Sequence, residues 1–215
     1  MNSLGQIVRL DCKNKEHSEI AASLHFKLLP NSTYAQLGDT FMREFVYDKL
    51  IKERLIQCDF FWCEGEYVGL IVYSEHSSTF IMNQAKKHYF IFLIYLILKC
   101  LIQNPFRLRT VFKMIKESTK RSSVENIENV EKIGQFLSFG VLRSHSTLKD
   151  MTTGMRISQL LFENMNNYFR KKNIKKFALL VNKQNKSALR FYYAHGGYIR
   201  ADFDQNTYEL GFNLS

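Results

Sequence analysis

The sequence has 215 residues, a length typical of one domain and at most two. Hydrophobic residues make up 46% and charged residues 23%, a composition that excludes disordered and fibrous classes. Thirty Lys and Arg against twenty Asp and Glu give a net charge of +10. This excess predicts a polyanionic partner: a nucleic acid, an acidic membrane surface or a phosphorylated small molecule.

Apolar residues at helical spacing predict helices over 14–28 and 34–57. A short strand at 6–10 precedes them. Two apolar runs at 58–65 and 66–75 flank a Gly-containing connection and predict a hairpin. The first third of the chain therefore runs strand, helix, helix, strand, strand.

The next segment joins an apolar run to a basic one. Residues 89–98 are all apolar, Pro105 separates them from the basic run, and 107–121 carries six Lys or Arg with Glu117 as its only acid. A bilayer span needs about 20 apolar residues, so the run is too short to cross a membrane alone. Two interpretations stay open: a core or lid helix followed by a solvated basic face, or a contact with an acidic membrane surface. We expect 122–132 to be a polar linker.

Regular structure resumes in the last third, where a polar loop leads from a strand into an amphipathic helix and a buried strand comes next, which is a βαβ unit. A short helix and an antiparallel pair close the chain. The predicted ranges are strand 134–142, loop 143–154, helix 155–172, strand 175–182, helix 185–195, and strands 197–203 and 207–212.

The loop at 152–158 runs into a helix N-terminus, where free N–H groups and the helix dipole favour an anion. Its small and hydroxylated residues suit a close backbone approach, and Arg156 adds a positive charge. By itself this pattern is more often only a turn that caps a helix beside one arginine.

The segment 182–198 is more specific. Asn185, Ala188, Phe191 and Tyr192 have the spacing N-x-x-A-x-x-[LF]-Y, and Gly196-Gly197 ends the helix. Together with the βαβ unit, this resembles the GNAT superfamily of acyl-CoA-dependent N-acetyltransferases.

The N-terminal half is similar to a GNAT branch often found with bacterial surface-glycan genes, whose members carry a long apolar and basic insertion. The matching features are Leu24-His25, Pro30, the run 37–41, Val68-Gly69 and the insertion at about 78–132.

The resemblance implies an α/β (α+β) fold, formed by one domain over 1–215. It implies a central mixed sheet of six to seven strands flanked by helices, with the insertion between the third and fourth strands. In this family the fourth strand, here 137–141, splays from the fifth, here 177–181, and the pantetheine arm lies in the opening.

The resemblance also implies site residues. The pantetheine arm would pair with the strand around Phe139 and Val141, and a peptide N–H near Val141 would stabilise the oxyanion. Tyr192 matches the tyrosine that protonates the leaving thiolate, a general-acid role; as core aromatics, Phe191, Tyr192 and Tyr193 would have no such role. The remaining residues expected to bind the cofactor are Thr153, Gly154, Met155, Arg156, Ile157 and Ser158 of the pyrophosphate loop, with Asn185 and Ser187 on the pantetheine side.

The pyrophosphate loop departs from the family pattern Q/R-x-x-G-x-G/A, because no register gives both glycines. With Gly154 first, Arg156 takes the second place; with Met155 first, Ile157 does. Because backbone N–H groups hold the phosphates, the loop could still function with its side chains turned away and Arg156 on a phosphate.

The general base is open. Glu75, at the end of the third strand, is the carboxylate best placed by analogy, whereas Gln135 stands where relatives often carry an acid. His25 is a second candidate, with a core or capping role as the alternative, and water-mediated deprotonation is a third route.

These features predict an acetyl-CoA-dependent enzyme that moves an acetyl group directly to a primary amine of a small molecule, with an amino sugar as the preferred acceptor. The alternatives are a protein or peptide N-acetyltransferase and a non-catalytic module that binds acyl-CoA or a membrane. The four cysteines lack C-x-x-C pairing and a nearby His cluster, so no metal is expected. Without an apolar signal core at its start, the chain is predicted to be cytoplasmic. We expect a monomer or homodimer, no nucleic acid partner, and peripheral membrane contact through 89–121 as the second interpretation of that segment.

Overall fold

The computed structural model describes residues 5–111 and 133–214. Its centre is a seven-stranded sheet with the order β1-β2-β3-β4-β5-β7-β6. Every neighbouring pair is antiparallel except β4 and β5, which are parallel. The expected mixed sheet is therefore confirmed. The strands are β1 (Gln6–Arg9), β2 (Gln57–Cys63), β3 (Glu66–Ser74), β4 (Ile133–Val141), β5 (Lys176–Asn182), β6 (Tyr198–Asp204) and β7 (Thr207–Asn213).

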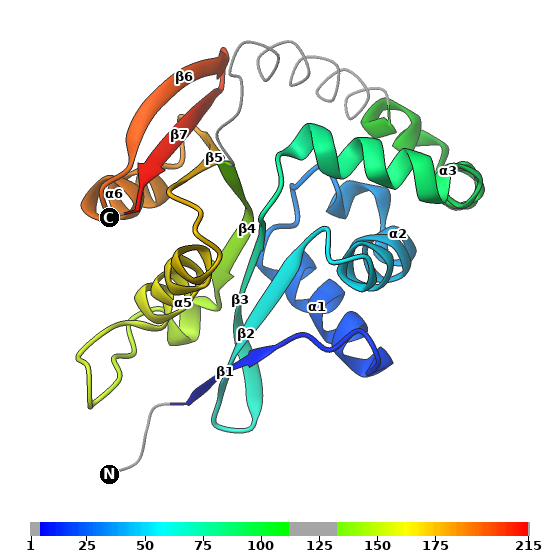
Figure 1. Ribbon diagram of the computed structural model, residues 1–215. Coiled ribbons are helices and arrows are strands. Elements are labelled where there is room, and N and C mark those ends of the chain that lie inside the picture. The colour runs from blue at the N-terminus through cyan, green and yellow to red at the C-terminus, as the bar shows by residue number, and fades with distance from the viewer. Residues whose placement is uncertain (1–4, 112–132, 215) are drawn as a thin grey trace.

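Helices cover both faces of the sheet (Figure 1). The first three α-helices lie on one side, and the last two lie on the other. The α-helices are α1 (Lys15–Leu28), α2 (Asp39–Phe41), α3 (Ser78–Gln103), α5 (Ile157–Lys171) and α6 (Lys186–Ala194). The structure also has the 3-10 helices η1 (Ala35–Leu37), η3 (Pro105–Arg107) and η4 (Arg143–His145) and the π-helix η2 (Met42–Leu50).

The two faces of the sheet bury separate cores, since neighbouring strand residues point to opposite faces. Phe60 of β2 belongs to the core that includes residues of α1, η2 and α3, whereas Phe61 belongs to the core that includes residues of α5 and α6. Each core is rich in aromatic and branched side chains, so burial stabilises both faces. Helices thus pack against both faces of the sheet, and side chains on the two faces belong to different cores.

The β2–β3 hairpin is confirmed. Its turn is Glu64-Gly65, with φ of 49° and 90°, between the paired residues Cys63 and Glu66. Two successive positive φ values define the hairpin turn whose twist matches that of its strands, and glycine takes the second position without strain.

The expected helix over 34–57 is wrong as one element. Gly38 has a φ of 101°, and a Cβ there would lie 2.7 Å from the Arg107 guanidinium, so the chain breaks between η1 and α2. Helical residues end at Lys52, because Arg54 takes a φ of 56° and β2 begins at Gln57. The apolar spacing continues to Leu55, which is buried after the helix has ended.

The insertion begins with α3, a long helix kinked at Tyr89, where φ is −130° and ψ is 21°. Tyr89 also connects the kink to the segment before β2, because its hydroxyl donates a hydrogen bond to Glu53 Oε1 at 2.6 Å. Burial and this hydrogen bond raise the pKa of Tyr89 to about 12, so the phenol stays a donor. The basic stretch is described only as far as residue 111, and the linker expected at 122–132 lies outside the described residues.

The last third has the predicted order of strand, loop, helix, strand, helix and antiparallel pair. Asn185 caps α6, and Gly196, with a φ of 86°, comes after its end. The register places β5 between β4 and β7, so the βαβ unit connects the two halves of the sheet.

Candidate functional site

The site is organised by the point at which β4 and β5 part. The two strands pair over four positions only, from Ile133 with Lys176 to Phe136 with Leu179. Leu137 is a bulge against β3, because Val72 pairs with Ser138 and Tyr73 with Phe136. A bulge bends a strand and increases its twist. Beyond Phe136, β4 keeps its pairing with β3 and leaves β5, as the splayed arrangement requires.

Aromatic side chains from β4 and α6 meet beside this parting. Phe136 lies edge-on to Tyr192, with ring centroids 5.9 Å apart, and Phe139 lies 5.6 Å from Phe191. Phe139 and Val141 are partly buried against the α5 and α6 core. Of the predicted residues, Phe139 and Val141 therefore pack against the same core that contains Tyr192.

Tyr192 is buried, whereas its neighbour Tyr193 is 44% exposed. Burial raises the pKa of Tyr192 above its ordinary value, because the phenolate would lose its hydration. Among the described residues, the Tyr192 hydroxyl has no hydrogen-bond partner. It is a neutral phenol that keeps its proton at physiological pH, the state a general acid needs before transfer.

The predicted phosphate loop forms a small turn closed by a bridge between Lys149 and Arg156. Its organiser is Asp150, a buried residue that the sequence patterns did not indicate. Asp150 Oδ1 accepts from the amides of Thr152 and Thr153, at 3.1 and 2.8 Å, and from the Thr153 hydroxyl at 3.0 Å.

The remaining loop amides are also engaged. Gly154 N donates to the Asp150 carbonyl at 2.7 Å, Met155 N to Thr153 Oγ1 at 3.2 Å, and Arg156 N to Gln159 Oε1 at 2.9 Å. The amides of Ile157 and Ser158 open α5 and have no intrahelical partner. An anion at this helix end would therefore meet those two amides first and would have Asp150 as a competitor for the others.

Asn185 and Ser187 lie at the start of α6, and both are exposed. Asn185 Oδ1 accepts from Ala188 N at 3.1 Å, which explains the spacing between these residues as a helix cap. The amide group of Asn185 keeps its donor Nδ2. Capping and ligand contact are therefore compatible for this side chain.

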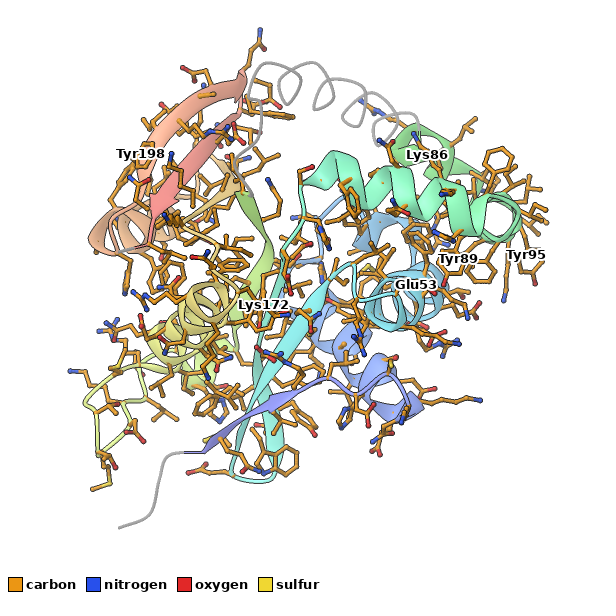
Figure 2. The ribbon with its side chains drawn as sticks, in the orientation of Figure 1. Glu53, Lys86, Tyr89, Tyr95, Lys172 and Tyr198 are labelled. Atoms are coloured by element: carbon orange, nitrogen blue, oxygen red, sulfur yellow. The ribbon has the colours of Figure 1, made fainter. Side chains whose placement is uncertain are left out.

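Glu75 lies on the α5 side, next to the paired residues Ser74 and Gln135. Its Oε1 accepts from the Tyr168 hydroxyl at 2.5 Å and lies 3.1 Å from Lys172 Nζ. Figure 2 shows Lys172 where the end of α5 meets the sheet. To take a proton, the carboxylate would have to compete with these donors.

His25 lies on the opposite face, buried between Tyr47 and Ser32. Its Nδ1 is 2.7 Å from Tyr47 Oη and its Nε2 is 2.9 Å from Ser32 Oγ. Burial lowers the pKa of His25 to about 4, so the ring is neutral at physiological pH. Both ring nitrogens are engaged, which is the pattern of a residue that ties α1 to its neighbours.

His25 also borders a narrow cavity of about 40 Å³ that reaches β4 at the bulge. This is room for a small group or a few waters. Tyr34, Tyr47, Ser78, Ile81, Leu137 and Ser138 are among its other walls. The cavity approaches β4 from the face opposite α5, where the first half of α3 covers it.

No protein-family model matches the sequence, and no curated protein matches it. Solved structures do. The PaiA N-acetyltransferase of Thermoplasma acidophilum in complex with coenzyme A is 12% identical, with 99% of each chain covered and a TM-score of 0.55. The GNAT domain of PAT from S. lividans is 10% identical, covering 98% of this chain and 90% of that one, with a TM-score of 0.53.

A third similar structure is the NatC complex bound to Gag peptide and CoA, 14% identical over 98% of this chain and 99% of that chain, with a TM-score of 0.51. At these identities the likeness concerns the fold. The chain has the GNAT fold, with its mixed sheet, parallel β4 and β5, and flanking helices.

Proposed function

We propose that the protein is an acetyl-CoA-dependent N-acetyltransferase that acts on a primary amine of a small molecule. The observation that carries this proposal is the parting of β4 from β5 beyond Phe136, with the neutral Tyr192 phenol beside it. A pantetheine arm needs an unpaired strand edge to lie along, and the leaving thiolate needs a proton donor. This fold supplies both at one place.

The proposed reaction is a direct transfer. The amine nitrogen attacks the thioester carbon, and an N–H near Val141 stabilises the oxyanion. The carbon–sulfur bond then breaks, and the thiolate takes the proton of the Tyr192 hydroxyl. The proton released by the amine goes to a base, for which we propose Glu75 acting through water, since it lies six strand residues, or roughly 20 Å, from the Gly69–Val141 pair. The cofactor's phosphates would lie at the start of α5, near Ile157, Ser158 and the positive charge of Arg156.

We favour a small acceptor over a peptide because Ser78 and Ile81 of α3 cover β4 at its bulge; the cavity of about 40 Å³ beneath them holds only a small group and is not itself the acceptor pocket. A peptide would need an open groove at the same place. We propose an amino sugar, free or carried on a nucleotide or lipid, as the acceptor class. The excess of positive charge suits the phosphates of such a carrier as well as those of CoA.

The test is the release of free CoA thiol from acetyl-CoA over a panel of amines: amino sugars, nucleotide-linked amino sugars, polyamines and peptide N-termini. We expect turnover with an amino sugar and none above background with peptides. Turnover only with peptides would replace the acceptor class. Intact CoA binding without turnover on any amine would leave a non-catalytic module and overturn the enzyme proposal.

The role of Glu75 has its own test. Glu75→Gln keeps an acceptor for Tyr168 but removes the proton-accepting carboxylate, so we expect turnover to fall by about a hundredfold. Tyr168→Phe removes the same hydrogen bond and leaves the carboxylate, and it serves as the matched control. Equal and small effects of both variants would mean that Glu75 only holds α5 against the sheet.

A further inference from the structure

The second half of α3, after the kink at Tyr89, carries an apolar face that nothing in the described structure covers. We call this face the outer stripe, and it consists of Phe90, Ile91, Ile94, Tyr95, Leu98 and Ile102. All six side chains are exposed, Ile91 and Ile102 at 83% each. Their spacing of three or four residues places them along one side of the helix. Soluble proteins rarely expose such a continuous apolar surface without a partner.

The opposite side of the same helix half is buried. Leu93 and Leu96 belong to the core on the α1 side of the sheet, and Phe92 and Ile97 pack against it. The helix is therefore apolar all round, and the inner residues prevent the outer stripe from turning inward. Figure 2 shows Tyr95 at the edge of the molecule, while Tyr89 lies beside Glu53. The exposure of the stripe is a consequence of how the helix is anchored.

The charged residues of the segment that carries the stripe have one sign. Residues 78–111 contain Lys86, Lys87, Lys99, Arg107 and Arg109 and no acidic residue. Lys99 lies 3.8 Å from Glu44 of η2, whereas Lys86, Lys87 and Arg109 are exposed. Lys87 lines the same surface hollow as Phe90, Ile91 and Tyr95, and Lys86 precedes it on the other side of the kink at Tyr89. An apolar stripe flanked by exposed cations matches a surface that is apolar inside and anionic outside.

A second copy of the chain fits less well. In a two-fold contact the same surface faces itself, so the outer stripe of one copy would bring its flanking cations against those of the other. No acidic residue within 78–111 would offset this repulsion. An anionic bilayer provides both the apolar interior and the counter-charge.

The stripe is also too short to cross a bilayer. Residues 90–103 span roughly 20 Å of helix, against a hydrocarbon core of about 30 Å. Over the described ranges 5–111 and 133–214, no helix is long and apolar enough to be a membrane span. We infer that the outer stripe lies in the surface of an anionic phospholipid bilayer, parallel to it, with Lys86, Lys87 and Arg109 among the headgroups.

The test is co-sedimentation of the full chain with vesicles of phosphatidylcholine alone or mixed with phosphatidylglycerol. We expect binding to the mixed vesicles, weakened by salt, and little binding to phosphatidylcholine alone. Ile91→Ser with Ile102→Ser should lower the partition coefficient by about tenfold or more, because two side chains lose their apolar burial. Lys86→Gln, Lys87→Gln and Arg109→Gln together should lower binding to the anionic vesicles and reduce its dependence on salt.

The matched control is Tyr198→Ser with Ile199→Ser. These exposed apolar residues lie on β6, and Figure 2 shows Tyr198 on the side of the molecule away from Tyr95. We expect this variant to bind vesicles as the wild type does. All substituted side chains are exposed, so circular dichroism and melting temperatures should confirm folding.

Two outcomes would overturn the inference. One is no binding to either vesicle, or binding that the outer-stripe variants leave unchanged. The other is a dimer in light scattering that Ile91→Ser with Ile102→Ser dissociates, without vesicle binding by the wild type, which would make the stripe an interface between copies.

Discussion

Arg9 of β1 donates from Nε to Asp59 Oδ1 of β2 at 2.7 Å, although the two residues are 50 positions apart in the chain. Asp59 Oδ2 also accepts from Tyr73 at 2.6 Å and from Asn164 of α5 at 2.8 Å. Asp59 is 1% exposed, whereas Arg9 is 45% exposed. Burial alone would lower the pKa of Arg9, but the hydrogen bond and charge of Asp59 raise it instead.

Because Asp59 is buried and Arg9 is half-exposed, we expect single and double variants of this pair to differ in stability in a definite order. Arg9→Met leaves a buried carboxylate without its cation and should lower the free energy of unfolding by about 3 kcal/mol. Adding Asp59→Asn removes the uncompensated charge, so the double variant should be more stable than Arg9→Met alone. Urea denaturation measures both. A double variant less stable than the single one would show that the carboxylate does not depend on Arg9.

Tyr192→Phe tests the proposed proton donor. The ring stays packed against Phe136, but the hydroxyl is lost, so turnover should fall at least about tenfold while the affinity for CoA changes little. Thiol release gives the rate, and calorimetric titration with CoA gives the affinity. Tyr193→Phe removes an exposed hydroxyl from the neighbouring position and should leave both unchanged. Equal turnover in wild type and Tyr192→Phe would remove the acid role.

Asp150→Asn tests the competition at the phosphate loop. The amide oxygen still accepts from Thr152 and Thr153, but a negative charge near the bound phosphates is gone. We expect the dissociation constant of CoA to fall about fivefold at low salt, equivalent to about 1 kcal/mol, and the gain to shrink at high salt. Asp204→Asn makes the same change of net charge in the β6–β7 turn and should have little effect. Weaker CoA binding in Asp150→Asn would mean that the carboxylate shapes the loop for its ligand.

His25 predicts a pH dependence of stability. Its pKa is about 4 in the folded chain and about 6.5 when unfolded. Between these values the unfolded chain binds a proton that the folded chain does not, so stability falls as pH falls from about 6.5 to about 4, by at most about 1.4 kcal/mol per pH unit. Above pH 6.5 the residue contributes no slope.

The measurement is the melting temperature of the wild type and of His25→Gln across this range. Glutamine retains hydrogen-bonding capacity toward Tyr47 and Ser32 but does not titrate. We expect a shallower decline for His25→Gln. Parallel curves would show that other groups carry the pH dependence.

Local patterns were enough to predict most elements, because caps, turns and periodicity are read from neighbouring residues. Asn185 and Gly196 mark the ends of α6, and Gly65 marks the hairpin. The helix over 34–57 failed because Gly38 and Arg54 adopt positive φ values that apolar spacing does not reveal. The contacts of Asp59 come from three other elements, and only the fold brings them together.

The residues of the candidate site were likewise predicted in part from the sequence. Tyr192, Phe139 and Val141 were predicted from a motif and a strand, and all three lie in or against the core on the α5 and α6 side of the sheet. Asp150 was not predicted, because an aspartate before a turn is common. Its hydrogen bonds with the amides of Thr152 and Thr153 depend on how the loop closes. A role that follows from the type of side chain, as for Tyr192, was predictable from the sequence. Which loop N–H groups are already hydrogen-bonded was not.

The four paired positions between β4 and β5 also divide the sheet into two cooperative units. β2 to β4 are joined by extended antiparallel pairing, as are β5 to β7, so the short seam between Ile133–Phe136 and Lys176–Leu179 is the weakest connection between the two halves of the sheet. Amide hydrogen exchange should then report two groups of protected strands with different opening energies. A molecule bound across the seam would clamp the two units and make them melt as one.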